Sequence, residues 1–345
     1  MPIIDADAHV IETDRTWQFV EDSLRNYAPV AATKEGVATP GGDYWLIDGS
    51  VRSRLGNIGP LFPKESREML DVSARLRHMD ELGTDIQVLF PSILTPYTER
   101  PEVEEAFCTT YNRWLADSWS QSNNRLRWAA ILPLMNMSKS LDELRYARDN
   151  GACAVFIRSI EGDRQLIDPY FFPLYEEAAK LNVAMCVHAS VGSPALDHIL
   201  AQGKDTGNFL RFKLTVVGAC HQIITNGIPQ QFPELRFGFV ETSSQWVPFV
   251  VNDLLRRFHR QGWDIPSGAE LLKQNRIYIT CQNDDDLPYV LQYAGEDNLI
   301  IGSDYGHADN ATEMEALQHL QRRTDIPKHV VKKILDDNPR ALYGL

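Results

Sequence analysis

Short runs of Val, Ile, Leu and Phe recur along the chain, and longer segments with a helical spacing of apolar residues separate them. Such runs are typical of buried strands, and their alternation with helices is typical of a parallel sheet. The pattern predicts eight strands, at Pro2–Asp7, Ile86–Pro91, Leu126–Leu134, Ala152–Arg158, Ala184–Ala189, Leu235–Glu241, Arg276–Cys281 and Leu299–Asp304. It predicts helices at Val72–Leu82, Val103–Ser122, Ser138–Asp149, Phe172–Leu181, Leu210–Asn226 and Thr312–Arg323. Eight strands with intervening helices predict an α/β fold of the (β/α)₈, or TIM-barrel, type.

Two of the predicted connections are longer than an ordinary strand-to-helix loop. Residues 11–70 include a hairpin-like stretch at Gly41–Trp45, and we expect this insertion to act as a lid over the barrel. Residues 190–208 contain VGSPALDH, whose Gly, Pro and Ser residues predict a loop. Neither segment is polar or long enough to be an interdomain linker. Residues 1–345 are therefore predicted to form a single domain with a lid-like insertion at about 11–70.

Composition narrows the range of partners and locations. Of 345 residues 43% are hydrophobic and 23% charged, as in ordinary globular proteins. The formal charge of −13, with no compensating Lys/Arg cluster, argues against binding to nucleic acid or to an anionic membrane. The five cysteines include no C-x-x-C pair and are expected to be reduced core thiols. No signal peptide and no membrane-spanning run is recognisable, so we expect a cytoplasmic protein.

Polar residues stand where several predicted strands end, which is the edge that carries the active site in barrels of this type. Asp7 and His9 are two positions apart at the end of the first strand, so their side chains can share one side of it. Asp5 has the same parity and is expected to lie deeper. The later strands end in Arg158, His188, Glu241 and Asp304, with Tyr305 and His307 just beyond the last one.

Two imidazoles and two or three carboxylates at one barrel end match the ligands that Zn²⁺, Mn²⁺ and Fe²⁺ prefer. Without a cation these anions would be costly to bury. We therefore predict one divalent metal ion, with a second ion left open. Structural roles are the alternatives: a hydrogen-bonded pair at Asp7 and His9, a core histidine at His188, a turn former at Asp304, and a Glu241 bound to backbone amides or to Arg158. Five other histidines lie in helical patterns and are interpreted as surface or packing residues: His78, His221, His259, His319 and His329.

Stretches along nearly the whole chain resemble the amidohydrolase superfamily, in particular the branch with aminocarboxymuconate-semialdehyde decarboxylase and the aromatic acid decarboxylases. They are IIDADAHV, RLRHMDELGTDIQVLFP, YNRWLADSWSQSNNRLRWAAILPL, DPYFFPLYEEAAKLNVAMCVHAS, FPELRFGFVETSSQWVP, LIIGSDYGHAD and KILDDNPRALYGL. The resemblance implies a metal-dependent TIM barrel. Its metal ligands would be Asp7, His9, His188 and Asp304.

The sequence departs from this pattern at two places. Asp7 stands where histidine is commonest, and the more oxygen-rich site that results favours Mn²⁺ or Fe²⁺ somewhat over Zn²⁺. The aromatic decarboxylases carry a histidine at the end of the sixth strand and a glutamate three residues on, where this chain has Glu241 and Ser244. The second departure weakens the case for decarboxylation.

Hydrolysis is the leading hypothesis from the sequence. A metal-activated water would attack the carbonyl of an amide, ester or thioester, and Asp304 or Glu241 would accept its proton beside the ligand His188. One alternative is non-oxidative decarboxylation of an aromatic or unsaturated acid. The other is a barrel that has lost catalysis and serves as a binding protein.

The expected partner is a small-molecule substrate, and a homodimer is left open. Arg158 would hold a substrate carboxylate or a developing oxyanion. Tyr305 and His307 would bind substrate or orient Asp304, with purely structural roles as the alternative. Aromatic side chains near the site favour a partly apolar or aromatic substrate; they are Tyr44, Trp45 and Phe62 of the lid and Trp246 after the sixth strand.

Overall fold

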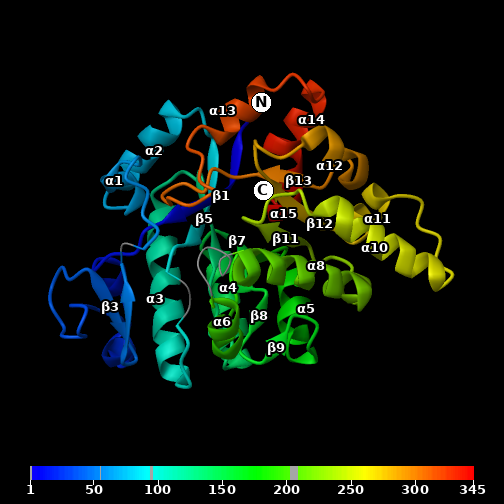
Figure 1. Ribbon diagram of the computed structural model, residues 1–345. Coiled ribbons are helices and arrows are strands. Elements are labelled where there is room, and N and C mark those ends of the chain that lie inside the picture. The colour runs from blue at the N-terminus through cyan, green and yellow to red at the C-terminus, as the bar shows by residue number, and fades with distance from the viewer. Residues whose placement is uncertain (1, 55, 94–95, 203–208) are drawn as a thin grey trace.

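Eight parallel strands form a barrel and follow one another round it in chain order. The computed structural model describes residues 2–54, 56–93, 96–202 and 209–345. The strands are β1 (Ile4–Val10), β5 (Ile86–Pro91), β6 (Leu126–Ala130), β7 (Ala152–Arg158), β10 (Ala184–His188), β11 (Phe237–Val240), β12 (Ile277–Cys281) and β13 (Leu299–Ile301). The barrel closes just beyond β13, where the Asp304 amide donates to the Asp7 carbonyl at 2.9 Å and Ala8 pairs with Tyr305. The predicted barrel is confirmed (Figure 1).

The strands are buried on both faces, as expected where helices cover the outside of a parallel sheet. All seven residues of β7, ACAVFIR, are buried. Full burial of side chains such as Val155 and Ile157 stabilises the fold by about 1.5–3 kcal/mol each. The five cysteines are free and buried, as predicted. The strand sequences thus make a packed core and leave chemistry to the residues at the strand ends.

Helices surround the barrel in Figure 1. The longer ones are α2 (Val72–Glu81), α3 (Pro101–Ser120), α4 (Met137–Asp149), α5 (Phe172–Lys180), α8 (Thr215–Thr225), α10 (Val247–Arg260) and α12 (Leu287–Ala294). In α10 the buried residues Val247, Val250, Val251, Leu254 and Phe258 recur at helical spacing, so one face packs inward. The shorter α-helices among the described residues are α1 (Lys64–Arg67), α6 (Pro194–Leu200), α9 (Ile228–Gln231), α11 (Gly268–Gln274), α13 (Ala316–Arg322), α14 (Lys328–Lys332) and α15 (Asn338–Tyr343).

The insertion after β1 contains an antiparallel sheet of β2 (Val30–Ala32), β3 (Tyr44–Ile47) and β4 (Ser50–Ser53). The predicted hairpin-like stretch therefore lies at the start of a real hairpin, whose turn uses positive φ at Asp48 and Gly49 (48° and 76°). This sheet stands to one side of the barrel, next to α3 (Figure 1). Further along, the Gly59 amide donates to the Gly306 carbonyl at 2.7 Å, so the insertion touches the loop after β13. A movement of the insertion as a lid stays a prediction.

Several predicted boundaries are wrong. The first strand continues to Val10, and the last one ends at Ile301. The helix predicted at Leu210–Asn226 is a π-helical segment at Phe209–Leu214 followed by α8. The helix predicted from Thr312 begins only at Ala316. The predicted loop at 190–208 contains α6, because Ser193 and Pro194 start a helix there; residues 203–208 of that segment lie outside the described residues.

Candidate metal centre

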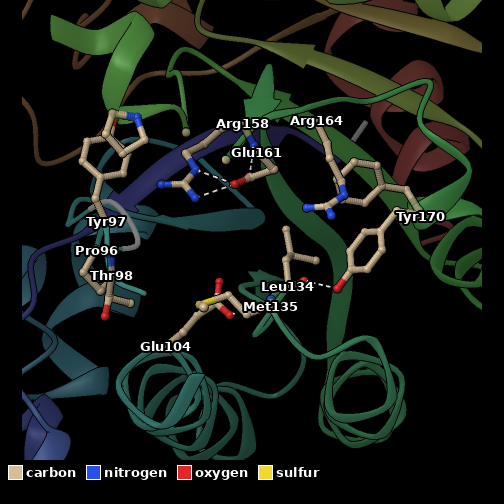
Figure 2. Close-up of a pocket in the computed structure, with 14 residues that line it drawn as sticks. Pro96, Tyr97, Thr98, Glu104, Leu134, Met135, Arg158, Glu161, Arg164 and Tyr170 are labelled. Carbon is tan, nitrogen blue, oxygen red and sulfur yellow. Dashed lines mark hydrogen bonds and ion pairs between the residues drawn. The ribbon is translucent and has the colours of Figure 1, made fainter. Parts of the chain in front are cut away.

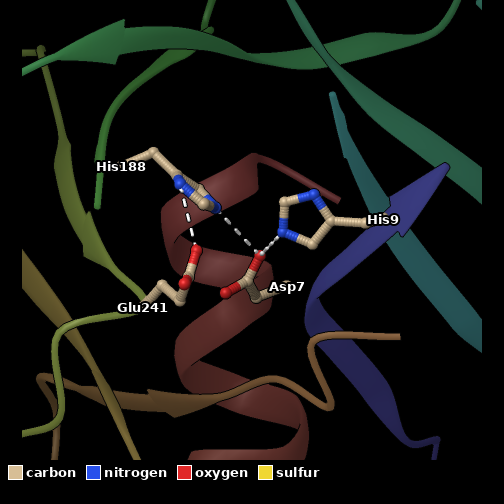
Figure 3. Close-up of side chains that lie close together, drawn as sticks. All are labelled: Asp7, His9, His188 and Glu241. Carbon is tan, nitrogen blue, oxygen red and sulfur yellow. Dashed lines mark ion pairs between the residues drawn. The ribbon is translucent and has the colours of Figure 1, made fainter. Parts of the chain in front are cut away.

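Four strand ends bring five side chains together at the carboxyl end of the barrel. Asp7 and His9 come from β1, and His188 is the last residue of β10. Glu241 follows β11, and Asp304 follows β13 by three residues. Figure 3 shows Asp7, His9, His188 and Glu241 pointing toward one another. We call these five residues the metal cluster.

The backbone at two of these positions is in the left-handed region. The φ angle is 62° at Glu241 and 52° at Asp304. This conformation is uncommon for residues other than glycine and is often found at functional sites. Hydrogen bonds hold it, because the Glu241 amide donates to Thr280 Oγ1 at 2.8 Å and the Asp304 amide donates to the Asp7 carbonyl. Each strand is thus turned sharply where it delivers its carboxylate.

The side-chain nitrogen and oxygen atoms of the metal cluster lie close to one another. His9 Nε2 lies 3.5 Å from Asp7 Oδ1 and 3.2 Å from Asp304 Oδ1. His188 Nε2 lies 3.5 Å from the same Asp7 oxygen, and its Nδ1 lies 3.3 Å from Glu241 Oε2. These are contacts between potential ligands of a common ion rather than ideal hydrogen bonds.

Buried atoms without hydrogen-bond partners show that the residues fit a cation. Asp7 Oδ1, His9 Nε2 and both ring nitrogens of His188 are buried and have no hydrogen-bond partner among the described residues. Leaving such atoms unsatisfied is costly. Ligand atoms of Asp7, His9, His188 and Glu241 all lie within 4.8 Å of one another. A divalent ion at this point would satisfy them, and two imidazoles with carboxylates are the donors that Zn²⁺, Mn²⁺ and Fe²⁺ take.

The orientation of His9 is set from outside the metal cluster. Its Nδ1 lies 3.1 Å from the Pro91 carbonyl at the end of β5. A carbonyl only accepts, so Nδ1 carries the hydrogen and Nε2 presents its lone pair to the cluster. An imidazole held by a backbone carbonyl in this way is a common arrangement for metal ligands.

Burial and charge crowding shift the pKa values of the acids. Burial raises the pKa of Asp304 to about 6. Burial, with the charge of Asp304, raises the pKa of Glu241 well above its usual range. Burial also acts to raise the pKa of Asp7, but the imidazoles of His188 and His9 outweigh it and hold that pKa well below its ordinary value. The crowding of like charges in a dry site is the condition that a bound cation relieves.

His307 completes one side of the site. Its Nδ1 lies 2.7 Å from Asp304 Oδ1, and its ring stacks on His9 with 3.7 Å between centroids. Its Nε2 lies 2.8 Å from Ser92 Oγ. His9, Glu241, Asp304 and His307 form a second set of donors that overlaps the first. His307 thus contacts Asp304, and its predicted roles in orienting Asp304 or binding substrate stay predictions.

The other predicted substrate-binding residues lie outside the metal cluster. Arg158 is buried and binds Glu161 through Nε at 2.9 Å, not Glu241. Tyr305 is fully buried and turned toward α2, where its hydroxyl lies 2.6 Å from His78 Nδ1. The Arg75 guanidinium lies 3.6 Å from the centre of the Tyr305 ring. The structure therefore gives Tyr305 a packing role, as it does His78.

The aromatic residues of the insertion pack within it or against Tyr305. Trp45 is 2% exposed and meets Trp17 edge-on, and Tyr44 is half-buried in the same strand. Phe62 is also buried and lies 4.4 Å from Tyr305, centroid to centroid. Trp45 and Phe62 are core residues in this structure. Trp246 is half-buried and lines a cavity of about 330 Å³ with Thr242 and Ser243, next to Glu241.

Sequence reasoning missed two supports of the site. Asp285, which follows β12, accepts hydrogen bonds from Ser243 Oγ and from the amide and hydroxyl of Ser244 at 2.5–2.8 Å. It therefore fixes the turn after Glu241. Glu12 accepts from the amides of Ser92 and Ile93 at 3.2 and 3.1 Å and so holds the segment that contacts His307. Only the position of Glu12, three residues after His9, could have suggested its role.

No helix in the described part of the chain is both long and apolar enough to cross a bilayer.

Comparison with known proteins supports the fold and identifies the family. A decarboxylase of 2-amino-3-carboxymuconate-6-semialdehyde from Dictyostelium discoideum is 22% identical over 270 residues, which are 74% of this chain and 72% of that protein. An amidohydrolase structure from Mycobacterium avium subsp. paratuberculosis K-10 has a TM-score of 0.81 and 18% identity, and the match covers 100% of this chain and 98% of the other.

A dihydroxybenzoic acid decarboxylase from Polaromonas sp. JS666 was solved with manganese and the inhibitor 2-nitroresorcinol. It has a TM-score of 0.65 and 17% identity, and the match covers 100% of this chain and 97% of the other. At these identities the likeness to solved structures shows the fold. A family model described as amidohydrolase (Amidohydro_2) matches residues 4–345. This chain therefore belongs to the amidohydrolase family.

Proposed function

We propose that this protein is a metal-dependent decarboxylase of a small aromatic or unsaturated carboxylic acid. The observation that carries the proposal is the metal cluster, in which buried nitrogen and oxygen atoms without hydrogen-bond partners among the described residues face one space. Two relatives with the same fold or a related sequence are named decarboxylases, and one was solved with manganese. These relatives support the reaction that the sequence ranked second.

The members of the metal cluster differ in solvent exposure, and we assign their roles from this difference. The side chains of Asp7, His9, His188 and Asp304 are at most 4% exposed, as expected for metal ligands. Glu241 is 14% exposed, so it is the member that a substrate can reach. A divalent ion bound by the four ligands would supply positive charge that binds the oxygen atoms of the substrate acid and orients it.

The same arrangement lets us assign the donor of the proton that replaces CO₂. When the bond between the carboxyl group and the carbon skeleton breaks, CO₂ leaves and the bonding electrons stay on the carbon. Glu241 in its protonated form then gives its proton to that carbon and becomes a carboxylate beside His188. Asp285 keeps Glu241 in place by fixing the turn that carries Ser243 and Ser244. Water subsequently restores the proton on Glu241.

Hydrolysis is the second candidate, and one observation favours it. This chain has Glu241 and Ser244 where the aromatic decarboxylases that it resembles have histidine and glutamate. Ser244 is bound to Asp285 and does not replace the missing acid. Glu241 alone could serve as the proton acceptor for an attacking water.

A product assay distinguishes the two reactions. The metal-loaded protein is incubated in ¹⁸O-water with carboxyl-¹³C-labelled dihydroxybenzoic acids and with 2-amino-3-carboxymuconate-6-semialdehyde. We expect ¹³CO₂ release from at least one acid, a rate lowered roughly 10²–10⁴-fold by Glu241→Gln, and an unchanged rate in the surface control Glu234→Gln. A parallel incubation in ¹⁸O-water uses an aryl ester and an aryl amide. Absence of ¹³CO₂ from the acids, together with ¹⁸O in the acid product of the ester or amide, would establish hydrolysis instead.

A further inference from the structure

A cavity of about 310 Å³ lies at the carboxyl end of the barrel, apart from the metal cluster. The segments after β5, β6, β7 and β10 line it, and no residue of the metal cluster does. Its volume lies at the lower end of the range for small-molecule sites. Figure 2 shows the side chains that surround it, among them Tyr97, Glu104, Leu134, Arg158, Glu161 and Tyr170.

One wall of the cavity is an ion pair. Glu161 accepts from the amide and from Nε of Arg158, at 2.8 and 2.9 Å through its two different oxygens. Both side chains are at most 8% exposed. The charges of this wall therefore offset each other, and the pair presents a rigid polar surface rather than a strong field.

Glu104 lies on the opposite side of the cavity from this pair in Figure 2. It belongs to the first turn of α3 and is only 6% exposed. Its Oε2 accepts from the Met135 amide at 2.7 Å, which fixes the direction of the carboxyl group. No ion pair with Glu104 is found in the described part of the chain. Burial raises its pKa to about 7. An almost dry carboxyl group thus faces the cavity, and the charges of Arg158 and Glu161 act on it in opposite directions.

Two aromatic rings form the sides. The Tyr97 hydroxyl donates to the Val191 carbonyl at 2.7 Å, and the Tyr170 hydroxyl donates to the Leu134 carbonyl at 2.5 Å. Because both hydroxyl groups have backbone acceptors, the rings are oriented and offer mainly their carbon surface to the cavity. A flat apolar body would fit between such surfaces.

We propose that this cavity is a binding pocket for a small aromatic molecule whose hydroxyl or amine group donates a hydrogen bond to Glu104. The rings of Tyr97 and Tyr170 would contact the body of the ligand, and the Arg158–Glu161 pair would close the far wall. The pocket needs no metal ion, since none of its lining residues belongs to the metal cluster. The proposal therefore does not depend on the decarboxylase reaction.

Phenol and anisole provide a matched pair of probes, because anisole keeps the ring and the oxygen but has no hydrogen to donate. Their affinities for the full-length protein are measured by ligand-observed NMR titration at pH 8.5, with and without metal ions. We expect phenol to bind roughly tenfold more tightly than anisole, equally well in both preparations. Glu104→Gln should weaken phenol binding roughly tenfold and leave anisole unchanged, and Glu102→Gln, an exposed carboxylate two residues earlier, should change neither.

Phenol and anisole are compared on the unmodified chain, so this comparison tests the proposed pocket even if Glu104→Gln folds poorly. Equal affinities for phenol and anisole would overturn the proposal. Phenol binding that disappears on metal removal would place the ligand at the metal cluster and would equally overturn it. Failure of the decarboxylase proposal would be seen separately, as absence of ¹³CO₂ in the presence of intact phenol binding.

Discussion

The backbone conformation of Asp304 determines where its own side chain and that of Tyr305 point. The Asp304 φ of 52° turns the chain three residues after the last strand, so its own side chain enters the metal cluster while Tyr305 is directed toward His78 and Arg75. The sequence predicted Asp304 correctly as a member of the group at the strand ends. It could not show the turn, because a left-handed conformation at an aspartate leaves no mark in the hydrophobic pattern. For this reason the sequence left both a site role and a purely structural role open for Tyr305.

Asp7 and His9 were easier to predict. They lie two positions apart in a strand, and a period of two places both side chains on one face. The partners that orient them are distant in the sequence: Pro91 holds His9, and the amide of Asp304 holds the Asp7 carbonyl. Such contacts depend on how the strands meet, and a single sequence does not contain that information.

At the residue scale, Asp304→Asn should weaken metal binding at least tenfold. The substitution keeps the shape but removes the charge that His9 and His307 face. Purified protein is dialysed against a metal buffer, and its metal content is determined by inductively coupled plasma mass spectrometry. The exposed control Asp264→Asn should retain the wild-type content. Equal metal contents in Asp304→Asn and the wild type would remove Asp304 from the ligand set.

The elements of the barrel were predicted better than the connections. Continuous apolar runs identify buried strands such as β7, and helical spacing identifies α2 and α4 within a residue or two. The segments that connect strands and helices depend on short sequence signals, and these fit more than one local structure. Ser193-Pro194 is compatible with a loop or with the first turn of a helix, and the structure has α6 there.

The seam between β1 and β13 depends on Gly302. A Cβ at this position would lie 2.2 Å from the Asp7 Cβ and 2.7 Å from the Asp7 amide nitrogen. Gly302→Ala must therefore push the two strands apart where they carry Asp7 and Asp304. We expect a loss of about 1–3 kcal/mol in the free energy of unfolding, together with weaker metal binding.

Urea denaturation of the metal-free protein measures this effect. Gly218→Ala in α8 is the matched control, because nothing lies within 4 Å of its added Cβ. Alanine in a helix is favourable, so the control should be neutral or slightly stabilised. A Gly302→Ala protein as stable as the wild type would mean that the seam tolerates separation.

At the scale of the whole molecule, the sequence predicted the barrel and the end of it that carries the site, since eight alternating units permit few other folds. It did not predict which side chains pack inside the insertion. Trp45 meets Trp17, a partner from another part of the same insertion, so an aromatic residue that looked available for substrate belongs to a small core. A prediction from composition does not distinguish these two uses of tryptophan.

Global stability should depend on pH through Glu104. Its pKa in the folded protein is about 7, above its ordinary value of 4.5, because of burial and the nearby charge of Glu161. The folded state then binds more protons than the unfolded state between these values. The stabilisation is complete below about pH 4.5 and is lost as the pH rises through about 7.

Glu104→Gln should remove this part of the pH dependence, on the order of 1–3 kcal/mol between pH 5 and 8. Urea denaturation at several pH values compares the variant with the wild type and with Glu102→Gln, which should keep the wild-type slope. Parallel curves for the wild type and Glu104→Gln would show that Glu104 takes up no proton on folding in this range.

Anomalous X-ray diffraction from crystals grown with Mn²⁺ tests most directly whether one cation joins the strand ends. We expect an anomalous peak at the manganese edge within ligand distance of Asp7, His9, His188 and Asp304. A metal-loaded crystal whose only peaks lie elsewhere on the protein, with these four side chains bonded to one another instead, would contradict it.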